Sequence, residues 1–374
     1  MSELNKQISQ NIPPSLTKRI DLNLGYSCNI KCRFCYYIND VMMRKKDKDL
    51  STEQCKKLIE YYYRQGMRVL EFTGGEPTIR RDLLGLVGYA RKTGFANISI
   101  ITNGIRLADR YYAHDLVQAG VNDFLFSLHG STADLHDFIT CVPGSYKLLL
   151  AAVHNLMNKG ARVRFNSVVT GTNLYDIYPR AKLFHSLGVK IINFIMFNPI
   201  EQAACSEESN FFRYSDAVLH LKRVIDEFGG FLNKLTIRYF PFCLMPGYER
   251  YIQNVHQVHY DHDEWNYYQR AYIREPYWKW LGGVLFGLLL LPQKNKWVIW
   301  GIEQAKHAAI LEAHTWLHKR KVSACYKCSY RFICGGVWKG YASRFHDDGL
   351  KPKKGPFIIE PWYFMDDAQI AKTI

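Results

Sequence analysis

Apolar and polar positions follow two alternating periods along the first half of the chain. Six short runs are rich in β-branched and aromatic residues, as buried strands are. They lie at residues 20–25, 68–73, 98–102, 123–128, 162–169 and 190–197. Between them apolar residues return at helical spacing, for example within 51–65, 83–93 and 146–159. This alternation predicts a parallel sheet, because parallel strands are joined by helical crossovers.

The number of strand and helix units indicates how the sheet is shaped. Six units between residue 19 and about residue 199 favour a sheet that curls into a barrel. We therefore expect an α/β fold, a partial (β/α)6 TIM-like barrel, with its chemistry at the carboxyl ends of the strands. Residues 1–18 are polar and contain Pro13 and Pro14, so we expect an extended lead-in there.

The pattern changes after residue 200, which predicts a second domain. A helix is expected at 214–228 and a strand at 235–240. We place the barrel at 19–210 and a smaller C-terminal domain at 211–374, with an insert at 248–300 that is dense in Tyr, Trp and His. Such rings suit stacking on sugars, bases or peptide side chains, and they equally suit packing within a small domain. We favour packing.

The composition and net charge of the chain indicate which kinds of binding partner to expect. The 374 residues are 48% hydrophobic, which is ample for a sizeable core. Lys and Arg exceed Asp and Glu by 49 to 34, so the formal charge of +15 favours anionic partners or a generally basic surface. No tract of Lys and Arg alone is present, and nucleic acid is therefore not an expected partner.

The sequence gives no sign of a membrane span or of secretion. The leucine-rich run at 281–291 has 11 residues, whereas a bilayer requires about 20. A buried helix is the expected explanation, and contact with a membrane surface is the alternative. Residues 1–20 lack the apolar core of a signal peptide, so we expect a reducing, cytoplasmic compartment. In that compartment clustered cysteines indicate metal ligands rather than disulfides.

A cysteine cluster follows the first predicted strand. Cys28, Cys32 and Cys35 have the spacing C-x3-C-x2-C within GYSCNIKCRFCYY. Three thiolates can hold three irons of a [4Fe-4S] cube and leave the fourth iron open. An open iron can chelate the amino and carboxylate groups of S-adenosylmethionine. Structural zinc is the alternative, although such zinc sites normally have four protein ligands.

This cysteine segment resembles that of the radical S-adenosylmethionine superfamily, in which an aromatic residue precedes the last cysteine, here Phe34. Further segments match the family in order, and each stands at the end of a predicted strand. They are Gly74, Gly75, Glu76 and Pro77 (GGEP), Thr102, Asn103 and Gly104 (TNG), and Ser127 within SLHG. His129 stands where relatives commonly carry an acid. The resemblance covers roughly residues 20–200.

The resemblance implies a fold, cofactors and roles for these residues. It implies S-adenosylmethionine and a [4Fe-4S] cluster as cofactors, and an electron donor of the flavodoxin or ferredoxin type. Phe34 is expected to lie against adenine, the turn at 74–77 to bind the methionine amino group, and Thr102 and Asn103 to lie near the cofactor. Glycines suit such a turn because they permit close backbone approach.

Two further residues of the barrel are candidates for cofactor contact. Arg164 and Asn166 lie on the fifth predicted strand, where they differ in direction from their immediate neighbours. They could meet the carboxylate or the ribose of the cofactor. The alternative is that they are ordinary solvent-facing strand residues.

A second cysteine set lies near the other end of the sequence. Cys325, Cys328 and Cys334 in CYKCSYRFICGG resemble the C-terminal segment of the radical enzymes with SPASM or twitch domains, which bind auxiliary iron-sulfur clusters. Cys243 in RYFPFCLMPGYE is the best candidate for a fourth ligand. We expect one auxiliary [4Fe-4S] cluster at these four cysteines, with a structural zinc ion as the alternative.

Three cysteines remain outside both sets. Cys55 lies on a predicted amphipathic helix and is expected in the core. Cys141 and Cys205 are weak catalytic candidates, since either thiol could return a hydrogen atom to a substrate radical.

These observations together predict an enzyme. We expect reductive cleavage of S-adenosylmethionine to a 5'-deoxyadenosyl radical, which abstracts hydrogen from a small molecule such as a sugar, a cyclitol or a nucleoside. A maturase of a ribosomally made peptide is the alternative, and we favour the small molecule because no segment like a peptide-leader recognition domain precedes the barrel. A non-catalytic metal-binding scaffold is the second alternative.

Overall fold

The computed structural model describes residues 14–35, 49–197, 199, 207–266, 269, 277–290, 302–347 and 349–366, with main chain only at 277–280. The chain divides into two compact units. The barrel unit comprises residues 21–212 and 216–236, and the C-terminal unit comprises residues 1–20, 213–215 and 237–374. Residues 216–236 thus belong with the barrel, beyond the predicted boundary at 210.

Eight strands form one sheet in which neighbours follow chain order. The registers from β2 to β6 and between β7 and β8 are parallel. The strands are β1 (Arg19–Asn23), β2 (Val69–Thr73), β3 (Asn97–Thr102), β4 (Asp123–Ser127), β5 (Arg162–Val169), β6 (Ile191–Met196), β7 (Lys234–Arg238) and β8 (Ile252–Gln253). The six predicted strands are confirmed, but the sheet has eight strands, because β7 and β8 extend it.

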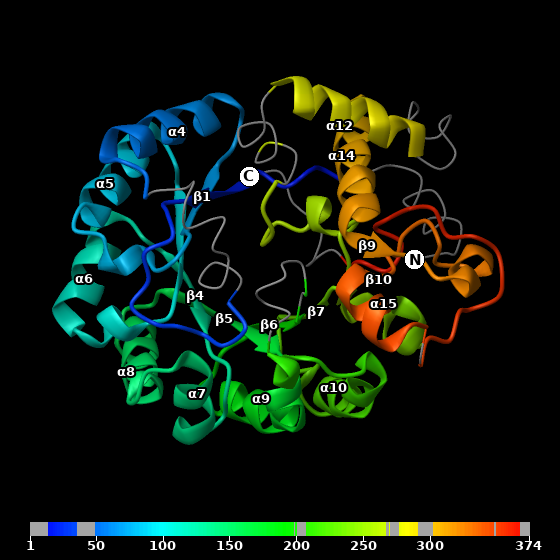
Figure 1. The fold of residues 1–374 in the computed structure, drawn as a ribbon. Helices are drawn as coiled ribbons and strands as arrows, with labels where there is room; N and C mark the ends of the chain where they lie inside the picture. Colours follow the sequence, from blue (N-terminus) through cyan, green and yellow to red (C-terminus); the bar gives the residue numbers. More distant parts are fainter. Residues whose placement is uncertain are drawn as a thin grey trace. The chain divides into compact units, whose positions relative to one another are not determined.

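Helices lie outside the strands of the barrel unit (Figure 1). They are α4 (Thr52–Arg64), α5 (Leu83–Thr93), α6 (Arg110–Ala119), α7 (Ala133–Thr140), α8 (Ser145–Met157), α9 (Ile177–Ser186) and α10 (Tyr214–Phe228). Local signals in the sequence set their first turns. Ser51 forms a capping box with Gln54 at the start of α4, and the Asp109 side chain accepts a hydrogen bond from the Tyr111 amide at the start of α6.

The C-terminal unit contains a helix pair and a small sheet. Helix α12 (Tyr277–Leu290) packs against α14 (Ile302–His318), which leads into β9 (Lys319–Arg320). Strand β9 pairs antiparallel with β10 (Val337–Trp338), and α15 (Lys339–Phe345) follows. Among the described residues, no helix is long and apolar enough to cross a bilayer.

The leucine-rich run forms most of α12, but it is not buried on all sides. Val284 is buried, whereas Leu285 and Leu289 are 56% and 71% exposed. The expectation of a buried helix is therefore wrong for one face of α12, while the face that contacts α14 is buried.

Part of the predicted lead-in belongs to the C-terminal unit. The Thr17 amide donates to the carbonyl of His259 at 2.7 Å, and the Asn266 amide donates to the carbonyl of Arg19 at 2.7 Å. The Thr17 hydroxyl adds a hydrogen bond to the carbonyl of Glu264 at 2.8 Å. Residues 14–20 are thus held by residues 259–266, and residues 1–13 lie outside the described part.

Candidate functional site

The loop that carries the first three cysteines begins against the glycine turn after β2. The Gly75 amide donates to the carbonyl of Gly25 and the Glu76 amide to the carbonyl of Ser27, both at 2.9 Å. A Cβ on Gly75 would lie 2.1 Å from the Ser27 oxygen, and Gly74 has a φ of +131°. Only glycines permit this contact, so the turn and the segment before Cys28 hold each other in place.

The far end of the same loop is held by helix α7. The Lys31 amide donates to the carbonyl of Thr140 and the Arg33 amide to the carbonyl of Ile139, both at 3.0 Å. The Arg33 guanidinium lies 4.0 Å from the ring centre of Phe138. The main chain therefore fixes the loop at both ends, independently of the cysteine side chains.

The three thiols lie close enough to influence one another electrostatically. Burial raises the pKa of Cys28 to about 11, and Glu76 and Cys35 add to the effect. Burial also raises the pKa of Cys32, followed by the effects of Cys35, Cys28 and Cys141. Such thiols stay protonated until a metal displaces the proton. Three converging cysteines, none of them in a disulfide, fit the ligation of a [4Fe-4S] cluster with one open iron.

Glu76 connects the ends of β2 and β3. Its carboxylate accepts hydrogen bonds from the Thr78 hydroxyl at 2.6 Å, the Thr102 hydroxyl at 2.8 Å and the Asn103 amide at 2.7 Å. Burial raises the pKa of Glu76, and these hydrogen bonds oppose the rise. Because its side chain serves the protein internally, the 74–77 turn offers a ligand mainly its main chain.

Asn103 connects the third strand end to the cysteine loop. Its side-chain amide donates to the Asn29 side chain at 2.7 Å, one residue after Cys28. Its own side-chain oxygen accepts from the Ile105 amide at 3.1 Å. The GGEP and TNG segments are therefore joined to each other through Glu76 and to the cysteine loop through Gly75 and Asn103.

A polar row crosses β4, β5 and β6. Ser127 stands opposite Asn166, and Asn166 opposite Asn193. The Asn193 amide donates to the Asn166 side-chain oxygen at 2.8 Å. Asn193 was not among the sequence candidates. Its signal is a single polar residue in the otherwise apolar run IINFIM. Contact of Ser127 and Asn166 with the cofactor stays a prediction.

Arg164 has a different environment from the one expected. It is fully buried, with its Nε 2.7 Å from the Asp123 carboxylate and an Nη 2.8 Å from the Glu71 carboxylate. The same Nη lies 3.1 Å from the Ser99 hydroxyl. Arg164 is thus not solvent-facing, and that alternative is wrong. Two internal carboxylates engage its guanidinium, so it ties together β2, β3, β4 and β5. Contact of Arg164 with the cofactor stays a prediction.

His129 packs against the predicted adenine residue. The rings of His129 and Phe34 meet edge to face with centres 4.7 Å apart. The His129 Nδ1 accepts from the Val168 amide at 3.3 Å, and the His136 Nδ1 accepts from the His129 amide at 3.2 Å. Burial lowers the pKa of His129 well below its usual range. The neutral ring therefore does not supply the charge of the acid that the family resemblance leads one to expect at this position, but it supports Phe34.

Of the two weak catalytic candidates, Cys141 lies within the described residues and Cys205 does not. Cys141 ends α7 with a φ of +57°, and its thiol is exposed. It lies near enough to Cys32 to raise the pKa of that thiol. Its proposed hydrogen donation stays a prediction. Cys205 lies outside the described residues.

The second cysteine set comes together in the C-terminal unit. Cys243, Cys325, Cys328 and Cys334 line one small cavity. Burial raises the pKa of Cys243 to about 12 and that of Cys325 to about 11, and Cys334 adds to both. Four thiols around one cavity fit a metal site, and both iron-sulfur clusters and zinc use four cysteines.

The cavity between these cysteines is small, with a volume of about 20 Å³. Its four thiol donors suit both predicted metals, so the [4Fe-4S] cluster and the zinc ion both stay predictions.

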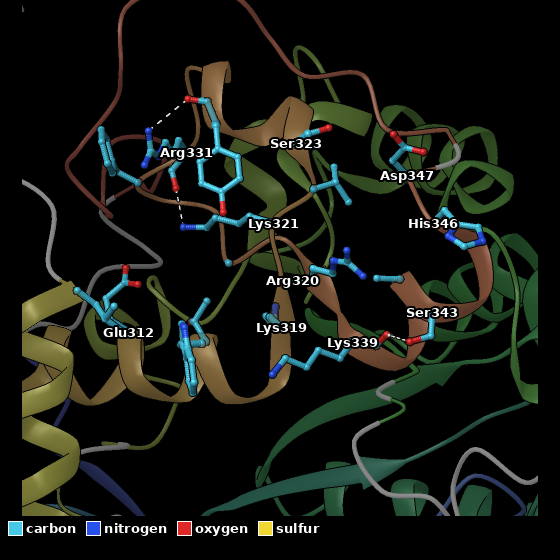
Figure 2. Close-up of a pocket in the computed structure, with 18 residues that line it drawn as sticks. Glu312, Lys319, Arg320, Lys321, Ser323, Arg331, Lys339, Ser343, His346 and Asp347 are labelled. Atoms are coloured by element: carbon cyan, nitrogen blue, oxygen red, sulfur yellow. Dashed lines mark hydrogen bonds between the residues drawn. The ribbon is translucent and has the colours of Figure 1, made fainter.

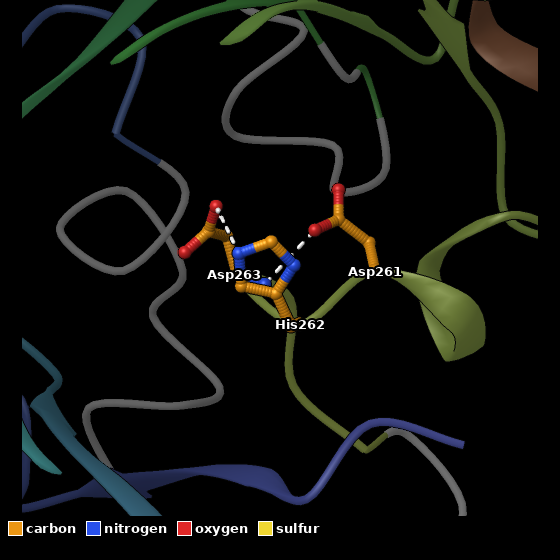
Figure 3. Close-up of side chains that lie close together, drawn as sticks. All are labelled: Asp261, His262 and Asp263. Carbon is orange, nitrogen blue, oxygen red and sulfur yellow. Dashed lines mark hydrogen bonds and ion pairs between the residues drawn. The ribbon is translucent and has the colours of Figure 1, made fainter. Parts of the chain in front are cut away.

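Asp261, His262 and Asp263 form a further group, which sequence reasoning did not select (Figure 3). One ligand atom from each residue lies within 4.8 Å of the others. Gln253 donates to Asp261, and the Arg19 guanidinium lies 3.8 Å from the Asp263 carboxylate. Gln253 and Arg19 thus provide polar partners for the two buried carboxylates, so their burial does not require a metal ion.

Comparison with known proteins identifies a family segment. Residues 22–194 match the model of the Radical SAM superfamily. The AdoMet-dependent heme synthase of Oleidesulfovibrio alaskensis is 30% identical over 178 residues, which cover 48% of this chain and 45% of that protein. The probable GTP 3',8-cyclase of Saccharolobus solfataricus is 30% identical over 184 residues, which cover 48% of this chain and 56% of that protein. The chain thus spans about half the length of these curated relatives.

Among solved structures, the chain is similar to Streptococcus suis SuiB bound to precursor peptide SuiA. The TM-score is 0.48 at 16% identity, and the match covers 61% of this chain and 49% of that chain.

Proposed function

We propose that this chain, in which residues 22–194 form a radical SAM domain, is an enzyme that cleaves S-adenosylmethionine and abstracts hydrogen from a second substrate. The family uses S-adenosylmethionine and a [4Fe-4S] cluster. One observation carries the proposal: three converging thiols on a loop fixed to the glycine turn and to α7. The activity of the whole chain goes beyond the matched segment and is our inference.

The residues divide the work of holding the two cofactors. Cys28, Cys32 and Cys35 would bind the cluster, which when bound supplies the electron that cleaves the sulfonium. The main chain of the 74–77 turn would bind the methionine amino group, because the Glu76 carboxylate is already engaged. Phe34, supported by His129, would lie against adenine.

We propose a small organic molecule as the substrate. The formal charge of +15 favours an anionic one. The two curated relatives described above are named for heme and for GTP, both of which are small molecules. A ribosomally made peptide is the second candidate, supported by the likeness of the 325–334 segment to auxiliary-cluster domains.

We propose an auxiliary [4Fe-4S] cluster at Cys243, Cys325, Cys328 and Cys334. The grouping of the four thiols supports a metal there. Zinc is the alternative with the same ligands, and it would only hold the fold, whereas a cluster could accept an electron.

The first experiment measures cofactor cleavage in anaerobically purified protein. With a reduced flavodoxin as donor, the protein should form 5'-deoxyadenosine and contain about eight irons per chain, four for each cube. Cys32→Ala should abolish 5'-deoxyadenosine formation, because it removes a ligand of the open cluster. Cys328→Ala should spare part of it and reduce the iron to about four.

Two results would contradict the proposal. Undiminished 5'-deoxyadenosine formation by Cys32→Ala would remove the first cluster from the reaction. One zinc and about four irons per chain would replace the auxiliary cluster by a zinc site. Transfer of deuterium from a labelled candidate into 5'-deoxyadenosine identifies the substrate.

A further inference from the structure

A second cavity lies in the C-terminal unit, lined by parts of α14, β9, α15 and the 321–335 segment (Figure 2). Its volume is about 1000 Å³, at the upper end of the range for small-molecule pockets. Five basic side chains line it: Lys319, Arg320, Lys321, Arg331 and Lys339. No sequence motif selected this cavity, because its residues come from separate elements.

The positive charge of this cavity is not balanced within the described part of the chain. None of the five basic residues forms an ion pair with a described acid. The cavity has two acidic lining residues, Glu312 and Asp347, which lie on opposite sides of the view in Figure 2. Burial raises the pKa of Glu312, and the charge of Lys321 opposes the rise. The cavity is therefore suited to an anion.

Lys319 is the most deeply buried of the five basic residues. It is 3% exposed, and its Nζ donates to the Asn254 side chain at 2.6 Å and lies 4.8 Å from the ring centre of Trp338. Its amine is thus held by an amide oxygen and an aromatic ring, and no described carboxylate forms an ion pair with it.

Aromatic side chains at the cavity suit an organic group. Trp316 is 56% exposed, and the Lys339 Nζ lies 5.5 Å from its ring centre. Tyr326 is 53% exposed, with the Arg331 guanidinium 5.0 Å from its ring centre. The volume exceeds what a single phosphate fills, and the rings offer stacking surface beside the charges.

We propose that this cavity binds a small organic molecule that carries a diphosphate group. Five basic side chains around one concave site match a group with several negative charges better than a single phosphate. Lys321 and Arg331 also line the cavity of the four cysteines, so the ligand would lie beside that metal site. The inference goes beyond hydrogen abstraction and does not depend on it.

Titration calorimetry of the anaerobically prepared, metal-loaded protein tests the proposal with inorganic pyrophosphate and uridine 5'-diphosphate. Both should bind saturably, and uridine should not. Arg320→Ala with Lys339→Ala should weaken binding at least tenfold. The matched control is Lys92→Ala with Lys147→Ala, two exposed lysines of the barrel unit, which should bind as the wild type does.

Further arms separate the possible outcomes. Circular dichroism checks that the double variant is folded. If the double variant does not fold, the single change Arg320→Gln, at an exposed residue, takes its place and should also weaken binding. Absence of saturable binding, equal loss in the control, or tighter binding of single-stranded DNA than of pyrophosphate would overturn the proposal. Cys32→Ala should bind pyrophosphate normally, so failure of the proposed reaction and failure of this inference are distinguishable.

Discussion

At the scale of single residues, Glu76 makes several internal hydrogen bonds in the barrel unit. Its buried carboxylate accepts from Thr78, Thr102 and Asn103, and thereby joins two strand ends. The GGEP pattern predicted a cofactor-binding turn, and the structure adds that its acidic side chain acts as an internal tie.

Changing Glu76 to Gln should destabilise the barrel unit by about 1–3 kcal/mol, because the amide group turns a donor toward groups that also donate. Urea unfolding followed by circular dichroism measures the loss. Asp115→Asn, at an exposed carboxylate of α6, is the control and should change stability by less than about 0.5 kcal/mol. Equal midpoints for Glu76→Gln and wild type would show that these hydrogen bonds are not needed.

The sequence predicted residues whose chemistry and spacing are local. Cys28, Cys32 and Cys35 stand within one loop, so their convergence follows from spacing alone. The environment of Arg164 was not predictable in this way, because its carboxylate partners Glu71 and Asp123 lie on other strands. The contact between His129 and Phe34 likewise joins segments far apart in the chain.

At the scale of elements, the pair α12 and α14 depends on close backbone approach. A Cβ on Gly287 would lie 1.8 Å from the carbonyl oxygen of Ala309. The two helices can therefore contact closely only where the side chain is a hydrogen atom. Apolar character predicted a helix at 281–291, but not which face of it would meet a partner helix.

Gly287→Ala should push the two helices apart and cost about 1–3 kcal/mol of stability, as overpacking does. The control is Gly282→Ala, where a Cβ has nothing within 4 Å. That change should stabilise by about 0.5–1 kcal/mol, because alanine favours a helix over glycine. Urea midpoints from tryptophan fluorescence measure both. A Gly287→Ala midpoint at or above that of Gly282→Ala would refute tight packing.

At the scale of the whole molecule, the two units can be observed separately. All eight tryptophans lie between residues 265 and 362, so tryptophan fluorescence reports on the C-terminal unit alone. Circular dichroism reports on both units. Buried histidines occur in each: His129 and His136 in the barrel unit, His256 and His259 in the other.

Acid should weaken the barrel unit through His136. Burial lowers its folded pKa from 6.5 to about 4, and its Nδ1 accepts the His129 amide. Below pH 6.5 the unfolded chain therefore takes up a proton that the folded chain does not, and stability falls as the pH drops toward about 4. The loss between pH 6.5 and 5 amounts to about 2 kcal/mol.

His136→Gln removes the titrating group and keeps an acceptor. Urea midpoints by circular dichroism at pH 7.5 and 5 should differ less for this variant than for the wild type. The fluorescence transition of the C-terminal unit should keep its full pH dependence, as should both transitions of His154→Gln, at an exposed histidine. The same acid loss in His136→Gln and wild type would contradict the assignment.

The extent of each unit and the lining of each cavity are set mainly by contacts between residues far apart in the sequence. Residues 14–20 lie in the C-terminal unit because they pair with residues 259–266, a contact that no local pattern announces. The basic cavity likewise gathers residues from α14, β9 and α15. Strand order in the barrel was predictable because each parallel strand follows the last, whereas the eighth strand has two residues and almost no pattern.

The clamping of the cysteine loop by main-chain hydrogen bonds has a consequence for maturation. Gly25 and Ser27 at one end, and Lys31 and Arg33 at the other, are held without help from iron. In a zinc finger, by contrast, the peptide folds only once the metal arrives. Here the main chain of the loop would have its final shape before a cluster is inserted. Protein that has lost its cluster to oxygen could therefore take up iron and sulfide again without refolding.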